Sequence, residues 1–169
     1  MASFLFIPYG NPSRRDDGVA FHIARRLIER LGLEVRDPEE VPTYEVGDGL
    51  TIMGLHQLAP ELAQDLAEAD VVVFIDAHVP GAGWDDVHWE AIEGELRPSM
   101  VTHQLKPQSV LALCQALYQR TPSTYVLSVL GTDFDFGGQL SSQAQALVEP
   151  AVERLMALLD AHTHRGDAQ

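Results

Sequence analysis

Short apolar runs alternate along the chain with segments in which apolar residues recur every three or four positions. The first pattern predicts strands and the second predicts amphipathic helices. Strands are expected at residues 4–8, 33–36, 50–53, 71–77, 88–97 and 124–130. Helices are expected at residues 19–31, from residue 62, around residues 110–117 and from residue 141 or 142. In the third helix, the residues expected to face the core are Val110, Leu111, Leu113 and Leu117.

The segment 71–77 gives the clearest strand prediction. Its unbroken apolar run is typical of a strand buried on both faces, as the central strand of a parallel sheet is. The acidic segment 39–49 contains proline and glycine and is interpreted as a loop or a weak edge element. Strands that alternate with helices predict a three-layer α/β domain.

One domain is expected. The 169 residues suffice for a single buried core, and no linker, internal repeat or low-complexity segment divides them. We expect this domain to cover residues 1–161 and a polar, frayed tail to cover residues 162–169.

The formal net charge of −14 at pH 7 argues against a nucleic-acid partner, because phosphate groups repel an acidic surface. Cys114 is the only cysteine, which excludes an intrachain disulfide, and its apolar neighbours predict that it packs in the core. The short apolar start is interpreted as a strand rather than a signal peptide, and no apolar run approaches the length of a membrane span. We therefore expect a cytoplasmic protein that does not bind membranes.

Three acids follow predicted strands. Asp16 and Asp17 lie in the turn before the first helix, and Asp76 stands at the end of the strand 71–77. Ligands of open α/β sheets usually bind at the carboxyl ends of the strands, so we expect Asp17 and Asp76 to share a rim. Two interpretations of the Asp16–Asp17 pair remain open. The pair caps the helix, or one acid suffices as a cap and the other is free to bind a ligand.

His56 and His103 also lie at predicted strand-to-helix transitions. The helix dipole keeps a histidine at a helix start neutral, ready to bind a metal ion, and divalent ions accept mixed Asp and His ligands. The alternative is that these side chains lie in solvated loops or pack in the core. His22 and His88 are interpreted as packing residues. The chain contains no His-Glu-x-x-His, Gly-x-Gly-x-x-Gly or phosphate-binding-loop motif.

Four segments carry a family resemblance in their order along the chain. Residues 10–19 read Gly-Asn-Pro-Ser-Arg-Arg-Asp-Asp-Gly-Val, which resembles a Gly-Asn-x-x-x-x-Asp-(Asp/Glu)-Gly signature. A second block spans 57–62 and 73–77, a third is His103-Gln104-Leu105, and a fourth spans 138–141 and 149–151. These blocks resemble those of the hydrogenase maturation endopeptidases, which trim the C-terminus of the large subunit of NiFe hydrogenases.

The resemblance implies a three-layer α/β/α sandwich with a twisted, mostly parallel sheet and a metal site in a cleft. It places the family's acidic metal ligand at Asp17 and its histidine ligand at His103. The chain departs from the family at residues 53–57, where the usual aspartate is missing. His56 is the expected third ligand, and the alternatives are a site open to Asp76 or an incomplete, inactive one. The implied metal is divalent, namely the nickel already inserted into the substrate.

We therefore expect a monomeric endopeptidase that acts on a nickel-loaded hydrogenase large-subunit precursor. Asp17 and Asp76 are the expected catalytic carboxylates, with the metal as Lewis acid and an ionised acid as base. Because the second acidic ligand is missing, the alternative is a non-proteolytic relative that binds metal or recognises a partner. An anion site at the helix after Asp17 is ranked last, because paired acids repel anions.

Overall fold

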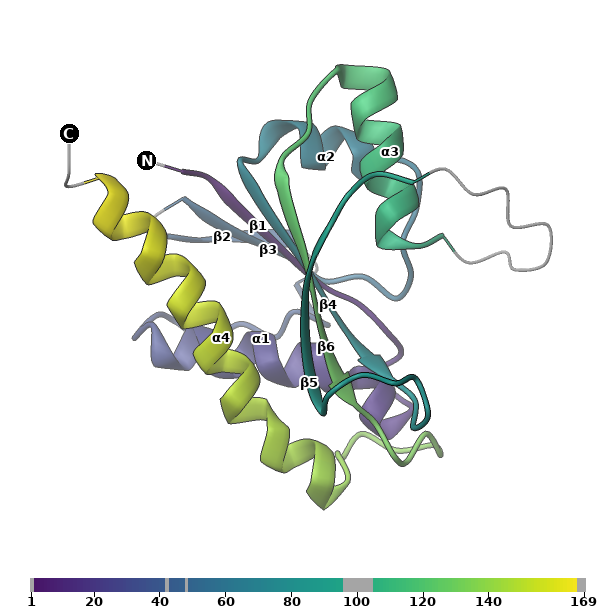
Figure 1. The fold of residues 1–169 in the computed structure, drawn as a ribbon. Coiled ribbons are helices and arrows are strands. Elements are labelled where there is room, and N and C mark those ends of the chain that lie inside the picture. Colours follow the sequence, from purple (N-terminus) through teal and green to yellow (C-terminus); the bar gives the residue numbers. More distant parts are fainter. Residues whose placement is uncertain (1, 42, 48, 96–104, 167–169) are drawn as a thin grey trace.

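The computed structural model describes residues 2–41, 43–47, 49–95 and 105–166, which form a sheet between two layers of helices (Figure 1). The strand order is β2-β3-β1-β4-β6-β5. The strands are β1 (Phe4–Pro8), β2 (Thr43–Gly47), β3 (Leu50–Met53), β4 (Val71–His78), β5 (Val87–Ile92) and β6 (Ser123–Leu130). The helices are the 3₁₀ turn η1 (Arg15–Gly18), α1 (Val19–Arg30), α2 (Leu62–Glu68), α3 (Pro107–Tyr118) and α4 (Ser142–Gly166).

Two helices cover each face of the sheet (Figure 1). α1 and α4 pack against each other over one face, in a core that includes Phe6 and Leu155. α2 and α3 pack together over the other face, where Phe74 and Leu111 are fully buried. The predicted three-layer α/β/α architecture is confirmed. None of the helices in the described part of the chain is both long and apolar enough to cross a membrane.

β4 lies inside the sheet, parallel to β1 on one side and to β6 on the other. Val71, Val73 and Ile75 pack into the core under α1 and α4, whereas Val72 and Phe74 pack into the core under α2 and α3. The prediction of a strand buried on both faces is therefore confirmed. Because β3 is also parallel to β1, four strands end at the same edge of the sheet.

The outer strands differ from the prediction. Residues 33–36 form no strand, and Leu33 and Val35 are exposed, because this short alternation has no neighbouring surface on which to bury a face. The edge strand is β2, which pairs antiparallel with β3 inside the acidic segment 39–49, so the edge-element interpretation of that segment is confirmed. β5 is the antiparallel strand at the other edge and ends at Ile92, earlier than predicted.

The inward face of α3 is only partly as predicted. Val110 and Leu111 are fully buried and Leu113 is partly buried, but Leu117 is 65% exposed, so its assignment to the core is wrong. Cys114 takes the inward position instead. It follows Val110 by four residues and Leu111 by three, which places all three on one face of the helix. The prediction that Cys114 packs in the core is confirmed.

The last two helices differ from the prediction at one end each. α3 begins at Pro107 and not at His103, which lies outside the described residues. α4 continues to Gly166, past the expected end of the domain at residue 161. The His162 ring packs edge-on against Phe4 of β1, with ring centroids 5.2 Å apart. This contact joins the helix to the sheet at residue 162, and residues 167–169 of the predicted tail lie outside the described residues.

Candidate active site

A pocket of about 520 Å³ lies at the carboxyl ends of β1 and β4. Its walls come from the ends of these strands, the turn before α2, the loop before β5 and the start of α3. Asp17, His56 and Asp76, which the sequence indicated, all line it, as do Tyr9 and Trp84. The parallel strands therefore bring residues from distant parts of the sequence into one pocket.

The turn after β1 positions Asp17. Gly10 has a φ of +143°, and a Cβ there would lie 2.1 Å from the backbone oxygen of Asp17, so only glycine fits. The backbone N–H of Asn11 donates a 2.8 Å hydrogen bond to Asp17 Oδ2. The backbone thus orients the half-buried carboxylate of Asp17 at the pocket wall.

Asp16 has a different environment, because it is fully buried and binds the segment 132–141. Its Oδ2 accepts hydrogen bonds from the backbone N–H groups of Thr132 and Asp133 at 2.9 and 3.0 Å. Ser141 donates twice, from its N–H to Oδ1 at 2.8 Å and from its hydroxyl to Oδ2 at 2.7 Å. Burial raises the pKa of Asp16, but these bonds outweigh it and hold the pKa below its ordinary value. Asp16 is therefore an ionised link between two loops.

Asp76 lies at the end of β4. The hydroxyl of Tyr9 donates a 2.5 Å hydrogen bond to Asp76 Oδ2, while Oδ1 is buried and has no hydrogen-bond partner among the described residues. Burial raises the pKa of Asp76, the hydrogen bond from Tyr9 and the nearby hydroxyl of Ser128 oppose this shift in part, and the charge of Asp17 adds to it. Ser128 acts from a position at which its hydroxyl forms no hydrogen bond to Oδ1. Burial and the charge of Asp76 also raise the pKa of Tyr9, which keeps its hydroxyl a donor. A carboxyl group with a raised pKa suits proton transfer near neutral pH.

A row of polar side chains extends from Asp76 across the sheet. Asp76 is paired with Ser128 of β6, which is paired with His88 of β5, so the three side chains share one face. Ser128 Oγ lies 2.9 Å from Nδ1 of the buried His78. The His88 ring stacks on Trp84 with ring centroids 4.0 Å apart. Of this row, Asp76 and Trp84 line the pocket, and the other side chains pack behind them.

Sequence reasoning did not single out Tyr9 or His78. A signal was available, because Tyr9 directly follows β1 and His78 ends β4, at the sheet edge that already indicated Asp76. What the sequence could not give is the approach of Tyr9 to Asp76, since 67 positions separate the two residues.

The expected metal ligands are only partly placed. Asp17 and His56 line the pocket, with His56 exposed, and His103 lies outside the described residues. Within the described ranges, no group of three His, Cys, Asp or Glu side chains could hold a metal ion. The charge of Asp17 acts on Asp76, whose Oδ1 is buried and has no hydrogen-bond partner among the described residues, so both oxygen ligands are of the type that divalent cations accept. Metal binding by Asp17, His56 and His103 therefore stays a prediction.

Replacing Asp16 by Asn should lower the free energy of unfolding by about 3 kcal/mol, because an amide cannot accept all four hydrogen bonds. The folded-state pKa of Asp16 lies below its unfolded value, so its stabilisation is present above about pH 4 and is lost as pH falls through the folded pKa. Urea unfolding at pH 7 and pH 3 should thus show a smaller difference between wild type and D16N at pH 3. An equal difference at both pH values would contradict an ionised Asp16.

Replacing Tyr9 by Phe should raise the pKa of Asp76, because the ionised carboxylate loses a hydrogen-bond donor. Carbon-13 NMR titration of the Asp76 carboxyl group measures this shift. Tyr125→Phe is the matched control, since Tyr125 stacks on Trp89 and does not line the pocket. An unchanged Asp76 titration in Y9F would show that the Tyr9 hydroxyl does not control this carboxyl group.

Solved structures of hydrogenase maturation proteases resemble this chain over almost its whole length. The hydrogenase maturating endopeptidase HybD from E. coli has a TM-score of 0.63 at 21% identity, over 95% of this chain and 93% of that chain. The NiFe hydrogenase maturation protease HybD from Thermococcus kodakarensis has a TM-score of 0.59 at 22% identity, over 92% and 98% of the chains. HycI from Thermococcus kodakarensis KOD1 has a TM-score of 0.61 at 16% identity, over 94% and 93%.

No family model matches the sequence, and no curated protein matches it either. At identities of 16–22%, the likeness to solved structures establishes a shared fold. The chain therefore has the fold of the hydrogenase maturation proteases, as its four sequence blocks predicted.

Proposed function

We propose that this protein is an endopeptidase that removes a C-terminal segment from the large-subunit precursor of a NiFe hydrogenase. The observation that carries the proposal is the buried, unpaired Oδ1 of Asp76, in the same pocket as Asp17. A buried acceptor without a donor is costly and is satisfied when a ligand supplies the missing group. The fold shared with hydrogenase maturation proteases supports this class of reaction over others.

In this proposal the nickel ion belongs to the substrate and enters the pocket with it. Asp17 and His56, which line the pocket, are two of the proposed ligands of the ion, and His103 is the third. The ion supplies a Lewis acid for the scissile carbonyl. The substrate's nickel also explains why paired carboxylates are tolerated, because a divalent charge offsets their mutual repulsion.

Asp76 is the proposed general base. Tyr9 occupies its Oδ2, which leaves Oδ1 to accept a proton from the attacking water. The charge of Asp17 and the burial of Asp76 both favour the protonated form of Asp76, so proton transfer to Oδ1 is assisted. Trp84 and the residues at the start of α3 also line the pocket, and we propose that they limit the access of water once the substrate is bound.

A non-proteolytic binding role is the second candidate, and the end of β3 favours it. No acid stands at residues 53–57, where the resemblance leads us to expect one. A Cβ on Gly54 would lie 2.3 Å from the backbone oxygen of Pro38 and 3.2 Å from the ring of Phe21, so no longer side chain fits there. In this alternative, the chain recognises a metal-loaded partner without cutting it.

Incubation with a nickel-loaded large-subunit precursor should shorten the precursor at its C-terminus, as measured by intact-mass spectrometry. Asp76→Asn should lower kcat at least about 100-fold, because a general base typically contributes that much or more. Asp160→Asn is the matched control, since Asp160 is an exposed acid on α4 and does not line the pocket. If the wild-type protein leaves the precursor intact, proteolysis is contradicted and the binding role is favoured.

Replacing His56 by Ala should weaken Ni²⁺ binding, measured by isothermal titration calorimetry, and raise the KM for the nickel-loaded precursor, each by at least about tenfold. The physical reason is the loss of an imidazole ligand from the pocket wall. His164→Ala, an exposed position near the end of α4, serves as the control. Wild-type metal affinity and cleavage in H56A would show that His56 is not a ligand.

A further inference from the structure

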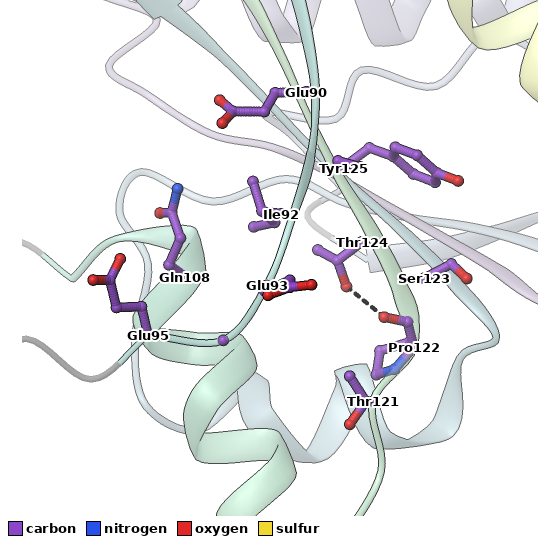
Figure 2. Close-up of a pocket in the computed structure, with 12 residues that line it drawn as sticks. Glu90, Ile92, Glu93, Glu95, Gln108, Thr121, Pro122, Ser123, Thr124 and Tyr125 are labelled. Atoms are coloured by element: carbon purple, nitrogen blue, oxygen red, sulfur yellow. Dashed lines mark hydrogen bonds between the residues drawn. The ribbon is translucent and has the colours of Figure 1, made fainter.

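Two buried polar side chains lie next to the candidate active site without lining its pocket. The buried polar side chains of the described residues are Asp16, His78, Thr124 and Ser128. Asp16 links two loops, and the hydroxyl of Thr124 donates a 2.9 Å hydrogen bond to the carbonyl of Pro122 near the start of β6 (Figure 2). His78 and Ser128 have neither role, because their hydrogen bond joins β4 to β6 at the rim where Asp76 stands.

The strand register places Ser128 beside two polar groups. Asp76 is paired with Ser128, and His78 follows Asp76 by two positions on β4, so all three side chains share one face of the sheet. Ser128 Oγ lies 2.9 Å from His78 Nδ1 and forms no hydrogen bond to Asp76 Oδ1. Ser128 thus neighbours an imidazole and a carboxylate, and its hydrogen bond goes to the imidazole.

The His78 ring is neutral at pH 7. Burial lowers its pKa and the charge of His88 adds to this shift, whereas the backbone of Asp85 and the charge of Asp86 oppose it in part. A neutral imidazole carries one proton, so one ring nitrogen donates and the other accepts.

The surroundings of Ser128 decide which nitrogen accepts. With the proton on Nε2 of His78, Nδ1 accepts the hydroxyl hydrogen of Ser128. With the proton on Nδ1, the ring donates to Oγ, and the hydroxyl hydrogen has no acceptor in hydrogen-bonding geometry among the described residues. A buried hydroxyl hydrogen without an acceptor is costly, so the first arrangement is favoured.

Packing fixes the His78 ring in this position. Trp84 packs edge-on against the ring, with ring centroids 5.3 Å apart, and Trp84 is itself stacked on His88. The backbone N–H of Gly131 also donates a 2.9 Å hydrogen bond to the carbonyl of His78. Nδ1 is therefore held where it can accept from Ser128.

The direction of the Ser128 hydroxyl matters for Asp76. The groups that act on the Asp76 carboxyl are the hydroxyls of Tyr9 and Ser128 and the charges of Asp17 and His88. Tyr9 already donates to Oδ2, so Ser128 is the hydroxyl that is left to reach Oδ1. A donor on Oδ1 would stabilise the carboxylate and make it a weaker base.

We propose that His78 and Ser128 are positioning residues of the active site. Nδ1 of His78 holds the Ser128 hydroxyl, which keeps Oδ1 of Asp76 without a protein donor and open to the proton of the attacking water. This inference rests on the proposed endopeptidase function. It gives two buried side chains, which do not line the pocket, control over the proposed general base.

The tautomer of His78 tests the arrangement in the wild-type protein. Long-range proton–nitrogen NMR at pH 8 should show the proton on Nε2 and a bare Nδ1. His162 is the internal reference, because its Nδ1 lies 3.0 Å from the carbonyl oxygen of Leu158 and needs a proton to bond to it. A proton on Nδ1 of His78 would overturn the inference, since Nδ1 could not accept from Ser128.

Replacing His78 by Phe keeps a ring beside Trp84 and removes Nδ1, so the Ser128 hydroxyl becomes free to donate to Asp76. Carbon-13 NMR should then show the Asp76 carboxyl group titrating about one pH unit lower than in wild type, the size expected for one hydrogen bond to a carboxylate. Adding Ser128→Ala to H78F should abolish this downward shift, because the donor is gone. His78→Asn, whose amide oxygen can accept from Ser128, should titrate near wild type.

Two matched variants control for the loss of a ring nitrogen and of a buried hydroxyl. His162→Phe and Thr124→Val make these changes at residues that do not line the pocket, and both should leave the Asp76 titration unchanged. A wild-type titration in H78F, or a downward shift that persists in H78F/S128A, would overturn the inference. Thermal unfolding identifies a variant that does not fold, in which case the wild-type tautomer decides.

Cleavage of the nickel-loaded precursor distinguishes the two proposals. H78F should lower kcat about three- to tenfold with little change in KM, because the base is weaker, and should shift the acid limb of the kcat profile to lower pH. If wild type cleaves but H78F changes neither kcat nor its pH profile, the positioning role fails and the endopeptidase proposal stands. If the tautomer and titrations are as expected but no precursor is shortened, the arrangement around Asp76 stands and the endopeptidase proposal fails.

Discussion

The fully buried carboxylate of Asp16 is the interaction on which the geometry of the site depends. A charge removed from water is tolerated only where donors replace the water, and the segment 132–141 supplies four hydrogen bonds. The backbone adds three more hydrogen bonds between the same loops, from Arg15 N–H to Gly137, from Asp16 N–H to Asp133 and from Gly137 N–H to Ser13. The loop after β1 is thereby fixed to the loop before α4, and Asp17 is held in place because it directly follows Asp16.

Two adjacent acids thus have opposite environments. Asp16 accepts four hydrogen bonds and stays ionised, so it is unsuited to proton transfer. Asp17 is half-buried, receives a backbone hydrogen bond and lines the pocket near Asp76. The division follows from the 3₁₀ turn η1, in which neighbouring side chains project in different directions.

The pocket combines a rigid frame with unbalanced charge. β4 is packed on both faces and cannot move without opening both cores, so Asp76 has a fixed position. Its carboxylate receives one strong donor, Tyr9, and keeps one oxygen unpaired beside the charge of Asp17. Such a site is least stable when empty and gains most from a ligand that brings positive charge.

The sequence by itself determined the layer architecture. The unbroken apolar run of β4 and the flanking segments, in which apolar residues recur every three or four positions, permit few other arrangements. It also indicated the edge of the sheet where Asp17 and Asp76 meet, since parallel strands end together. Prediction from the sequence failed at positions where the spacing of apolar residues gave only a weak signal. Residues 33–36 and Leu117 had suitable residue types but no surface to pack against.

Only the tertiary structure decided that Asp16 accepts a full set of hydrogen bonds and that Asp76 keeps one oxygen without a donor. The donors to Asp16 are more than a hundred positions away, and Tyr9 reaches Asp76 across two parallel strands. Local patterns record which residues must be buried, whereas hydrogen-bond partners far apart in sequence are chosen by the way the buried faces come together.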